Sequence, residues 1–139
     1  MNAALTEAQT IAQLVAQPLT VAVVGLSPKP HRDSFGVAQY MQAHGWRIVP
    51  INPNASEILG EKAYPTLTEA AQHVRIDMVN CFRNSEDIPP IAAEAIAIGA
   101  KSLWLQLGVV NNAAAQLATE AGLVVVQDRC LMVEHRQRR

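Results

Sequence analysis

The feature that most constrains the fold is a repeated order of helix, glycine and strand. Helical patterns stop at Gly45, Gly99 and Gly122, and each of these glycines precedes a short, largely apolar run. Glycine adopts the left-handed backbone conformation found at helix ends without steric cost. Strands that alternate with helices in this way are typical of a parallel sheet with right-handed crossovers. The repeat therefore predicts an α/β fold.

The expected elements cover almost the whole chain. The patterns predict strands at 20–24, 46–51, 76–82, 102–107 and 123–126. They predict helices at 4–17, 35–44, 68–73, 88–98 and from 111 or 112 to 121, followed by a C-terminal helix. The predicted capping residues are Thr6, Asp33 or Ser34, Ser85, Asn111 or Asn112, and Asp128.

These elements fit one domain over residues 1–139, a length that can bury a core. We expect a Rossmann-like, three-layer fold with helices on both faces of a parallel sheet of about five strands. The expected strand order is 3-2-1-4-5. Residues 1–17 would contain an N-terminal helix that packs on the domain.

Composition excludes several classes of function. The net charge of −1 gives no electrostatic reason to expect a nucleic-acid partner. No apolar stretch approaches the roughly 20 residues of a membrane span, and the N-terminus lacks the pattern of a signal peptide. Cys81 and Cys130 have neither the density of a disulfide framework nor the spacing of a metal site. We therefore expect a cytoplasmic protein with reduced thiols.

The loop after the first predicted strand is the strongest candidate for ligand binding. Ligands of such sheets bind outside the carboxyl ends of the strands, which selects the loops 25–34, 52–57, 82–88, 106–112 and 127–130. In the first of these, Gly25 allows close backbone approach, Ser27 offers a hydroxyl, and Lys29 and Arg32 offer positive charges. The following helix would present its positive end to an anion. This loop predicts a cradle for phosphate groups.

The loop nevertheless departs from the dinucleotide fingerprint. Ser27 and Pro30 occupy the second and third glycine positions of the G-x-G-x-x-G pattern. The second strand leads into Asn52-Pro53, and no carboxylate follows until Glu57. Both departures argue against a nicotinamide or flavin dinucleotide.

The residues of the next two loops can be interpreted either as ligand-binding residues or as ordinary structural residues. Asn52 and Pro53 can form an Asx turn with an apolar edge for a flat ring, or a plain turn. Phe82 can pack on a base and Arg83 can bind phosphate in bidentate fashion, or they are a core residue and a surface residue.

The last two loops contain Gln106, Gly108 and Cys130. Gln106 is an unusual residue for a buried strand, and Gly108 allows close approach of a ligand; the alternative for Gln106 is a core amide satisfied by a neighbouring loop. Cys130 is expected in the first turn of the last helix, where the helix dipole and Arg129 would favour a thiolate. A small side chain that fills space is the alternative. The loops contain no catalytic triad, paired carboxylates or metal cluster, so we expect neither catalytic residues nor a metal.

Together these segments resemble those of small, stand-alone CoA-binding domain proteins, which are similar to the Rossmann-type domain at the N-terminus of the succinyl-CoA synthetase α subunit. The resemblance spans about residues 12–136. Leu26 and Ile51 depart conservatively from the family pattern, and the phosphohistidine and ligase segments of the synthetase have no counterpart in this chain. The matching segments are VVGLSPKP at 23–30, VPINP at 49–53, ILG at 58–60, DMV at 77–79, FR at 82–83, WLQLG at 104–108 and DRC at 128–130.

The resemblance implies that the ligand is coenzyme A or an acyl-CoA. It implies that Gly25, Ser27, Lys29 and Arg32 hold the phosphates, Asn52 and Pro53 border the adenosine, Phe82 and Arg83 close the other side, and Gln106 and Gly108 line the pantetheine path. Two alternatives stay open: a thiol-redox or acyl-thioester protein that uses Cys130 with bound CoA, and an interaction protein that kept a nucleotide-binding fold. A second copy of the chain or a partner enzyme is a further possible partner.

Overall fold

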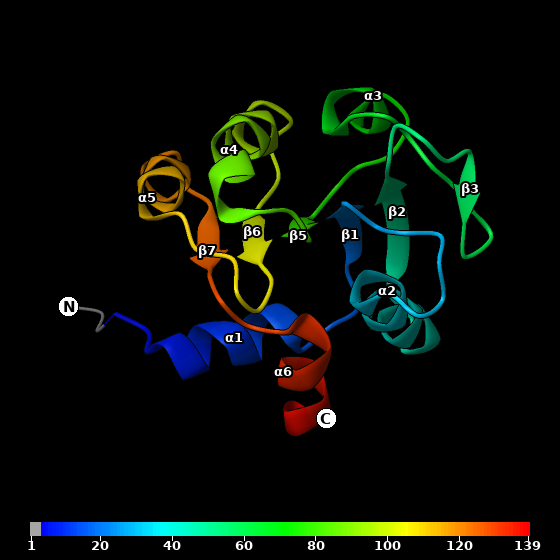
Figure 1. Cartoon of the computed structure of the whole chain (residues 1–139). Helices are drawn as coiled ribbons and strands as arrows, with labels where there is room; N and C mark the ends of the chain where they lie inside the picture. Colours follow the sequence, from blue (N-terminus) through cyan, green and yellow to red (C-terminus); the bar gives the residue numbers. More distant parts are fainter. Residues whose placement is uncertain (1–3) are drawn as a thin grey trace.

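A five-stranded parallel sheet forms the middle layer of the molecule (Figure 1). The computed structural model describes residues 4–139; residues 1–3 of the expected N-terminal segment lie outside the described residues. The strands are β1 (Thr20–Val24), β2 (Arg47–Ile51), β5 (Met78–Cys81), β6 (Ser102–Leu105) and β7 (Val124–Val126). The α/β, Rossmann-like fold with a five-stranded parallel sheet is therefore confirmed.

The predicted strand order was wrong, because the third long strand lies on the other side of the first. The observed order is β2-β1-β5-β6-β7, which is 2-1-3-4-5 when the five strands are counted along the chain. After β2 the chain crosses back, and Asp77 attaches it to the free edge of β1. The Asp77 N–H donates to the Thr20 carbonyl, and the Asp77 carboxylate accepts from the Thr20 N–H, each at 2.9 Å. Strand order therefore reverses between β1 and β5, where ligands of such sheets bind.

Three helices cover each face of the sheet (Figure 1). One face carries α3 (Leu67–Ala71), α4 (Ile88–Ala97) and α5 (Asn112–Glu120), and the other carries α1 (Glu7–Val15), α2 (Asp33–Ala43) and α6 (Leu131–Arg138). Because both faces are covered, the central strands are buried on both sides. No helix within residues 4–139 is long and apolar enough to cross a membrane.

Sequence patterns did not predict three short elements. After β2, a two-stranded antiparallel hairpin pairs β3 (Glu57–Ile58) with β4 (Glu61–Lys62). A 3-10 turn, η1 (Ser85–Asp87), precedes α4. Elements of two or three residues are too short to show a hydrophobic period.

Two of the predicted helix caps are confirmed. Thr6 forms a full capping box with Gln9 at the start of α1. The Asn111 side chain accepts the Ala114 N–H at 3.0 Å and caps α5.

The predicted caps at Asp33 or Ser34, Ser85 and Asp128 were wrong. Ser34 accepts a backbone N–H of the loop that leads into α2, and Ser85 and Asp128 accept backbone N–H groups of other loops. α2 is preceded by Arg32, α4 by Asp87 and α6 by Cys130, none of which makes a side-chain cap. Ser34 accepts from Ser27 at 3.0 Å, Ser85 from Val110 at 3.0 Å and Asp128 from Gly108 at 2.7 Å. The three side chains thus hold the loops at the carboxyl edge of the sheet in place.

Candidate ligand-binding site

Three clefts adjoin one another at the carboxyl edge of the sheet. The β2 cleft, of about 530 Å³, lies beside the loop after β2; the central cleft, of about 420 Å³, lies over the loop after β1. The thiol cleft, of about 650 Å³, runs from α2 to the start of α6 and includes Cys130. Gly25 borders the first two clefts, Arg83 the first and third, and Phe82 the second and third. These shared residues make the clefts one continuous surface.

Nine of the ten predicted binding residues line these clefts. Asn52 and Pro53 lie in the β2 cleft, Ser27 and Lys29 in the central cleft, Arg32 in the central and thiol clefts, and Gln106 in the thiol cleft. Gly25, Phe82 and Arg83 lie where clefts meet. Gly108 lines none of the three; its N–H instead donates to the Asp128 carboxylate, and this bond closes the loop between them.

Gly25 lies at the point where strand order reverses. Its φ is +83°, a conformation that other residues rarely adopt, and a Cβ atom there would lie 2.5 Å from the Phe82 carbonyl oxygen. The loops after β1 and β5 therefore approach each other too closely for any side chain at position 25.

The loop after β1 leaves its positive charges free. The Ser27 hydroxyl accepts the Lys29 N–H at 3.1 Å, which shapes the turn from within. Lys29 and Arg32 are exposed, and neither forms a salt bridge with any described residue. Arg32 is also the residue from which α2 begins, so both charges lie near a helix N-terminus that favours anions.

Asn52 shapes the wall of the β2 cleft. Its side-chain oxygen accepts the Asn54 N–H at 2.7 Å, which confirms the predicted Asx turn. Its Nδ2 donates to the Leu26 carbonyl at 2.9 Å and ties the β2 loop to the β1 loop. The turn leaves the neighbouring Pro53 ring at the cleft surface.

Arg83 lies between the β2 cleft and the thiol cleft. Its guanidinium forms an ion pair with Asp87 at 3.3 Å, and about half of its side chain is exposed. Glu94 of α4 lines the opposite wall of the β2 cleft and accepts hydrogen bonds from the Thr68 N–H and hydroxyl at 3.0 and 2.8 Å. Sequence reasoning missed Glu94, because its position at this cleft depends on how α4 packs beside α3, which local patterns do not show.

The thiol cleft combines polar and apolar walls. Gln106 is only 7% exposed, and its Oε1 accepts the Leu131 N–H at 3.5 Å, so the predicted core role and the cleft position both apply. Leu107, Val109 and Met132 add apolar surface, of which Leu107 is 68% exposed.

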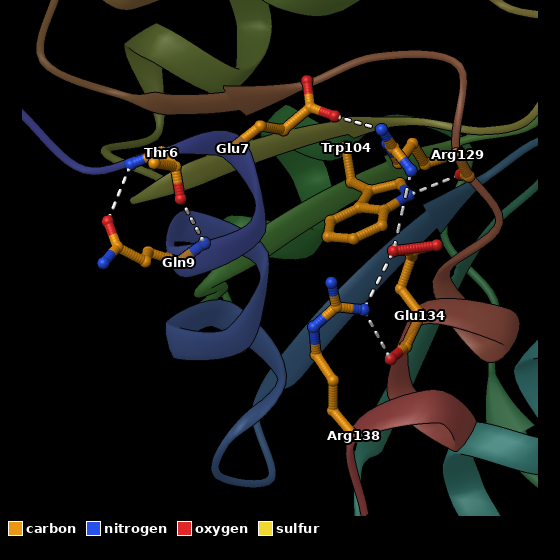
Figure 2. Close-up of polar contacts among 7 residues, drawn as sticks. All are labelled: Thr6, Glu7, Gln9, Trp104, Arg129, Glu134 and Arg138. Atoms are coloured by element: carbon orange, nitrogen blue, oxygen red, sulfur yellow. Dashed lines mark hydrogen bonds and ion pairs between the residues drawn. The ribbon is translucent and has the colours of Figure 1, made fainter.

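Cys130 directly precedes α6 and is half-buried at the cleft. The Trp104 indole N–H donates to the Arg129 carbonyl at 2.7 Å, as Figure 2 shows. The Arg129 guanidinium forms an ion pair with Glu7 of α1 and lies 3.8 Å from the Glu134 carboxylate (Figure 2). Arg129 thus links α1 to α6, and its charge is engaged with these two acids.

The second cysteine, Cys81, is not accessible from the clefts, and the described residues contain no metal-binding cluster. Cys81 is fully buried in β5, and burial raises the pKa of its thiol to about 12, with a smaller opposing effect of the Arg83 charge. Within residues 4–139 no group of three or more His, Cys, Asp or Glu side chains could hold a metal ion.

The reversed strand order and the clefts at the carboxyl edge define the class: a small Rossmann-like α/β domain with a candidate site at the switch point. The chain belongs to the family of CoA-binding domains, whose family model matches residues 19–136.

Comparisons with known proteins agree with this assignment. The chain is 41% identical over 125 residues to the uncharacterized protein YneT of Bacillus subtilis strain 168, covering 90% of this chain and 91% of that protein. A hypothetical protein from Pyrococcus horikoshii OT3 has a solved structure that matches with a TM-score of 0.89 at 33% identity, covering 99% of this chain and 98% of that one. An acetate–CoA ligase (ADP-forming) II of Archaeoglobus fulgidus is 31% identical over 86 residues, which cover 60% of this chain and 12% of the ligase.

Proposed function

We propose that this chain binds coenzyme A or an acyl-CoA along its three clefts and has no catalytic activity of its own. The observation that carries the proposal is that three clefts of different character adjoin one another. One has an Asx turn and a proline ring, one has free cations and one is largely apolar, which suits the adenosine, the diphosphate and the pantetheine of CoA respectively. Membership of the CoA-binding family supports the same ligand.

The phosphate part of the proposal rests on charge. Lys29 and Arg32 line the central cleft together with Asp33 and form no salt bridge with any described residue, and Arg83 adds a third positive charge where the β2 and thiol clefts meet. A guanidinium binds phosphate oxygens with charge-assisted, often bidentate hydrogen bonds. We assign the phosphates of CoA to these three side chains, with Ser27 and the backbone at Gly25 forming the floor.

The adenosine and pantetheine parts rest on shape and polarity. The Asx turn at Asn52 and the ring of Pro53 form a rigid wall for a flat base and ribose. Phe82 lies between the central cleft and the thiol cleft, and in the thiol cleft Gln106 and apolar side chains suit the amide-bearing pantetheine arm. Gly108 would act indirectly, by holding the loop after β6 in place through Asp128.

The lack of catalysis is inferred from the kinds of side chain present. The clefts are rich in hydrogen-bond donors and cations. Of the two acids that line them, Glu94 is already bonded to Thr68, and Asp33 lies in the same cleft as the cations Lys29 and Arg32. A role in holding or delivering CoA, to a partner enzyme or within a homo-oligomer in the cytoplasm, fits such a site.

Isothermal titration calorimetry with CoA, acetyl-CoA, NAD⁺ and ATP tests the proposal. We expect saturable binding of CoA or acetyl-CoA and much weaker binding of NAD⁺. The proposal would be overturned if neither CoA nor acetyl-CoA gave heat at about millimolar concentration. A Kd of about 1 mM corresponds to a binding free energy of about −4 kcal/mol.

A further inference from the structure

We propose that Cys130 forms a reversible mixed disulfide with the CoA thiol in the thiol cleft, with CoA disulfide as the reacting species. This inference rests on the proposed function and adds a covalent state to the same site. It draws on the position of Cys130, on an unpartnered polar group that faces the same cleft, and on the contrast with the second cysteine.

Two side chains of β6 and its extension fix the backbone on either side of Cys130. Trp104 donates from its indole to the carbonyl of Arg129, and Gln106 accepts the N–H of Leu131. Trp104 is fully buried, and Figure 2 shows its indole N–H directed at the Arg129 carbonyl. The thiol is therefore held at one place on the cleft wall by a rigid strand, as a pre-organised reactive group requires.

Gln106 points independently to a ligand in this cleft. Its side chain is more than nine-tenths buried, and its Nε2 has no hydrogen-bond partner among the described residues. This Nε2 is not among the buried atoms that lack a partner, so solvent reaches it at the cleft surface and it is free to donate to an acceptor on a ligand. The amide carbonyls of a pantetheine arm are such acceptors, and the thiol of that arm would then lie in the cleft that contains Cys130.

The apolar wall supports the same occupant. Leu107 lies in the thiol cleft with 68% of its surface exposed, beside Val109 and Met132. The methylene groups of pantetheine would cover this surface and remove it from water.

Cys81 provides an internal contrast. It is fully buried in the sheet, and burial raises the pKa of its thiol to about 12, so it does not supply a thiolate near neutral pH. Cys130 is therefore the cysteine available for exchange.

The reaction is a thiol–disulfide exchange that balances without another oxidant. The Cys130 thiolate attacks one sulfur of CoA disulfide, the bond between the two CoA sulfurs breaks, and the bond from Cys130 to CoA forms. The second CoA leaves as a thiolate and takes up the proton that Cys130 lost. A reduced thiol reverses the step.

Intact-mass spectrometry of the full chain after incubation with CoA disulfide tests the proposal. We expect one adduct with the mass of CoA less two hydrogens, located on the peptide that contains Cys130, lost on treatment with dithiothreitol and absent from Cys130→Ser. Glutathione disulfide is the matched reagent without a nucleotide. Because bound CoA disulfide reacts as if intramolecular, its adduct should form at least about tenfold faster than that of glutathione.

Three results would overturn the proposal: no adduct, an adduct on Cys81, or equal rates with the two disulfides. Calorimetry of the wild-type chain with reduced CoA and a phosphine reductant separates this failure from that of the proposed function. Binding of reduced CoA without an adduct refutes the disulfide alone. Absence of both refutes the CoA site as well.

Discussion

A Cβ atom at position 25 would lie 2.5 Å from the carbonyl oxygen of Phe82, so Gly25 and Phe82 bring the loops after β1 and β5 into direct backbone contact. These loops carry the central cleft on one side and Arg83 on the other. The close approach of the backbones at Gly25 and Phe82 thus sets the spacing between the positive charges of the β1 loop and Arg83 of the β5 loop. A side chain at position 25 would separate the very loops that form the candidate site.

Gly25→Ala should therefore reduce both stability and CoA binding. The φ of +83° and the clash with Phe82 together should lower the free energy of unfolding by about 3 kcal/mol or more. Gly99→Ala is the matched control, because its φ is +75° and its Cβ would meet nothing within 4 Å. The control should lose about 1–2 kcal/mol and keep its CoA affinity. Urea denaturation and calorimetry measure both quantities; equal effects of the two substitutions would contradict the close approach.

Arg83→Glu should weaken CoA binding by more than about 1.5 kcal/mol, since it replaces a charged hydrogen-bonding partner of the phosphates by a repulsive one. Arg75→Glu makes the same change of charge at an exposed residue beside a separate cleft that also includes His73 and Gly99. Calorimetry should find the affinity of the Arg75 variant unaltered. If Arg83→Glu also binds with wild-type affinity, Arg83 does not contact the phosphates.

Asn80→Leu should raise stability. Asn80 is 1% exposed on β5, between Val23 of β1 and Trp104 of β6, and its side-chain oxygen has no hydrogen-bond partner within residues 4–139. A buried polar atom without a partner costs about 1–3 kcal/mol, and leucine has the same branched arrangement of heavy atoms without a polar atom. We expect a gain of about 1 kcal/mol or more in the free energy of unfolding from urea denaturation. A loss of stability would mean that the Asn80 amide is satisfied in solution.

Acid should destabilise the contact between α6 and α2 through His135. Burial, then the charges of His44 and Arg139, lower the pKa of His135, whose Nδ1 shares a hydrogen bond of 2.9 Å with the Tyr40 hydroxyl. The unfolded chain therefore binds a proton at His135 more readily than the folded chain does. The contribution of neutral His135 to the free energy of unfolding is fully present above the ordinary histidine pKa of about 6.5, and it is lost as the pH falls below that value.

Urea denaturation between about pH 5 and 8 measures this dependence. The His135→Gln variant should show a shallower loss of stability in acid than the wild type. Identical profiles for wild type and His135→Gln would show that His135 does not contribute.

The sequence predicted the local elements well because their signals are local. The apolar run at 20–24 coincides with β1, and Thr6 and Asn111 cap the helices that their patterns indicated. The predicted strand order was wrong, because the apolar pattern of residues 76–82 does not show which edge of β1 they join. Asp77 of this segment attaches it to β1 through two hydrogen bonds to Thr20, which are visible only in three dimensions.

In the candidate site, too, local features were predictable from the sequence and tertiary contacts were not. Loop position at the carboxyl edge was enough to select Asn52, Phe82 and Arg83, which the fold brings to adjoining clefts. Ser34 and Asp128 are residue types that commonly cap helices, yet Ser34 accepts the Ser27 N–H of the loop before α2 and Asp128 accepts the Gly108 N–H of another loop. Such competition between local and distant partners depends on tertiary structure.

Backbone amide NMR of the full chain during titration with CoA tests the central claim most directly. If CoA occupies the three clefts, the largest chemical-shift changes should fall on Gly25, Ser27, Asn52 and Gln106, while residues 72–75 beside the separate cleft stay unchanged. Changes confined to 72–75, or no changes at saturating CoA, would contradict the account.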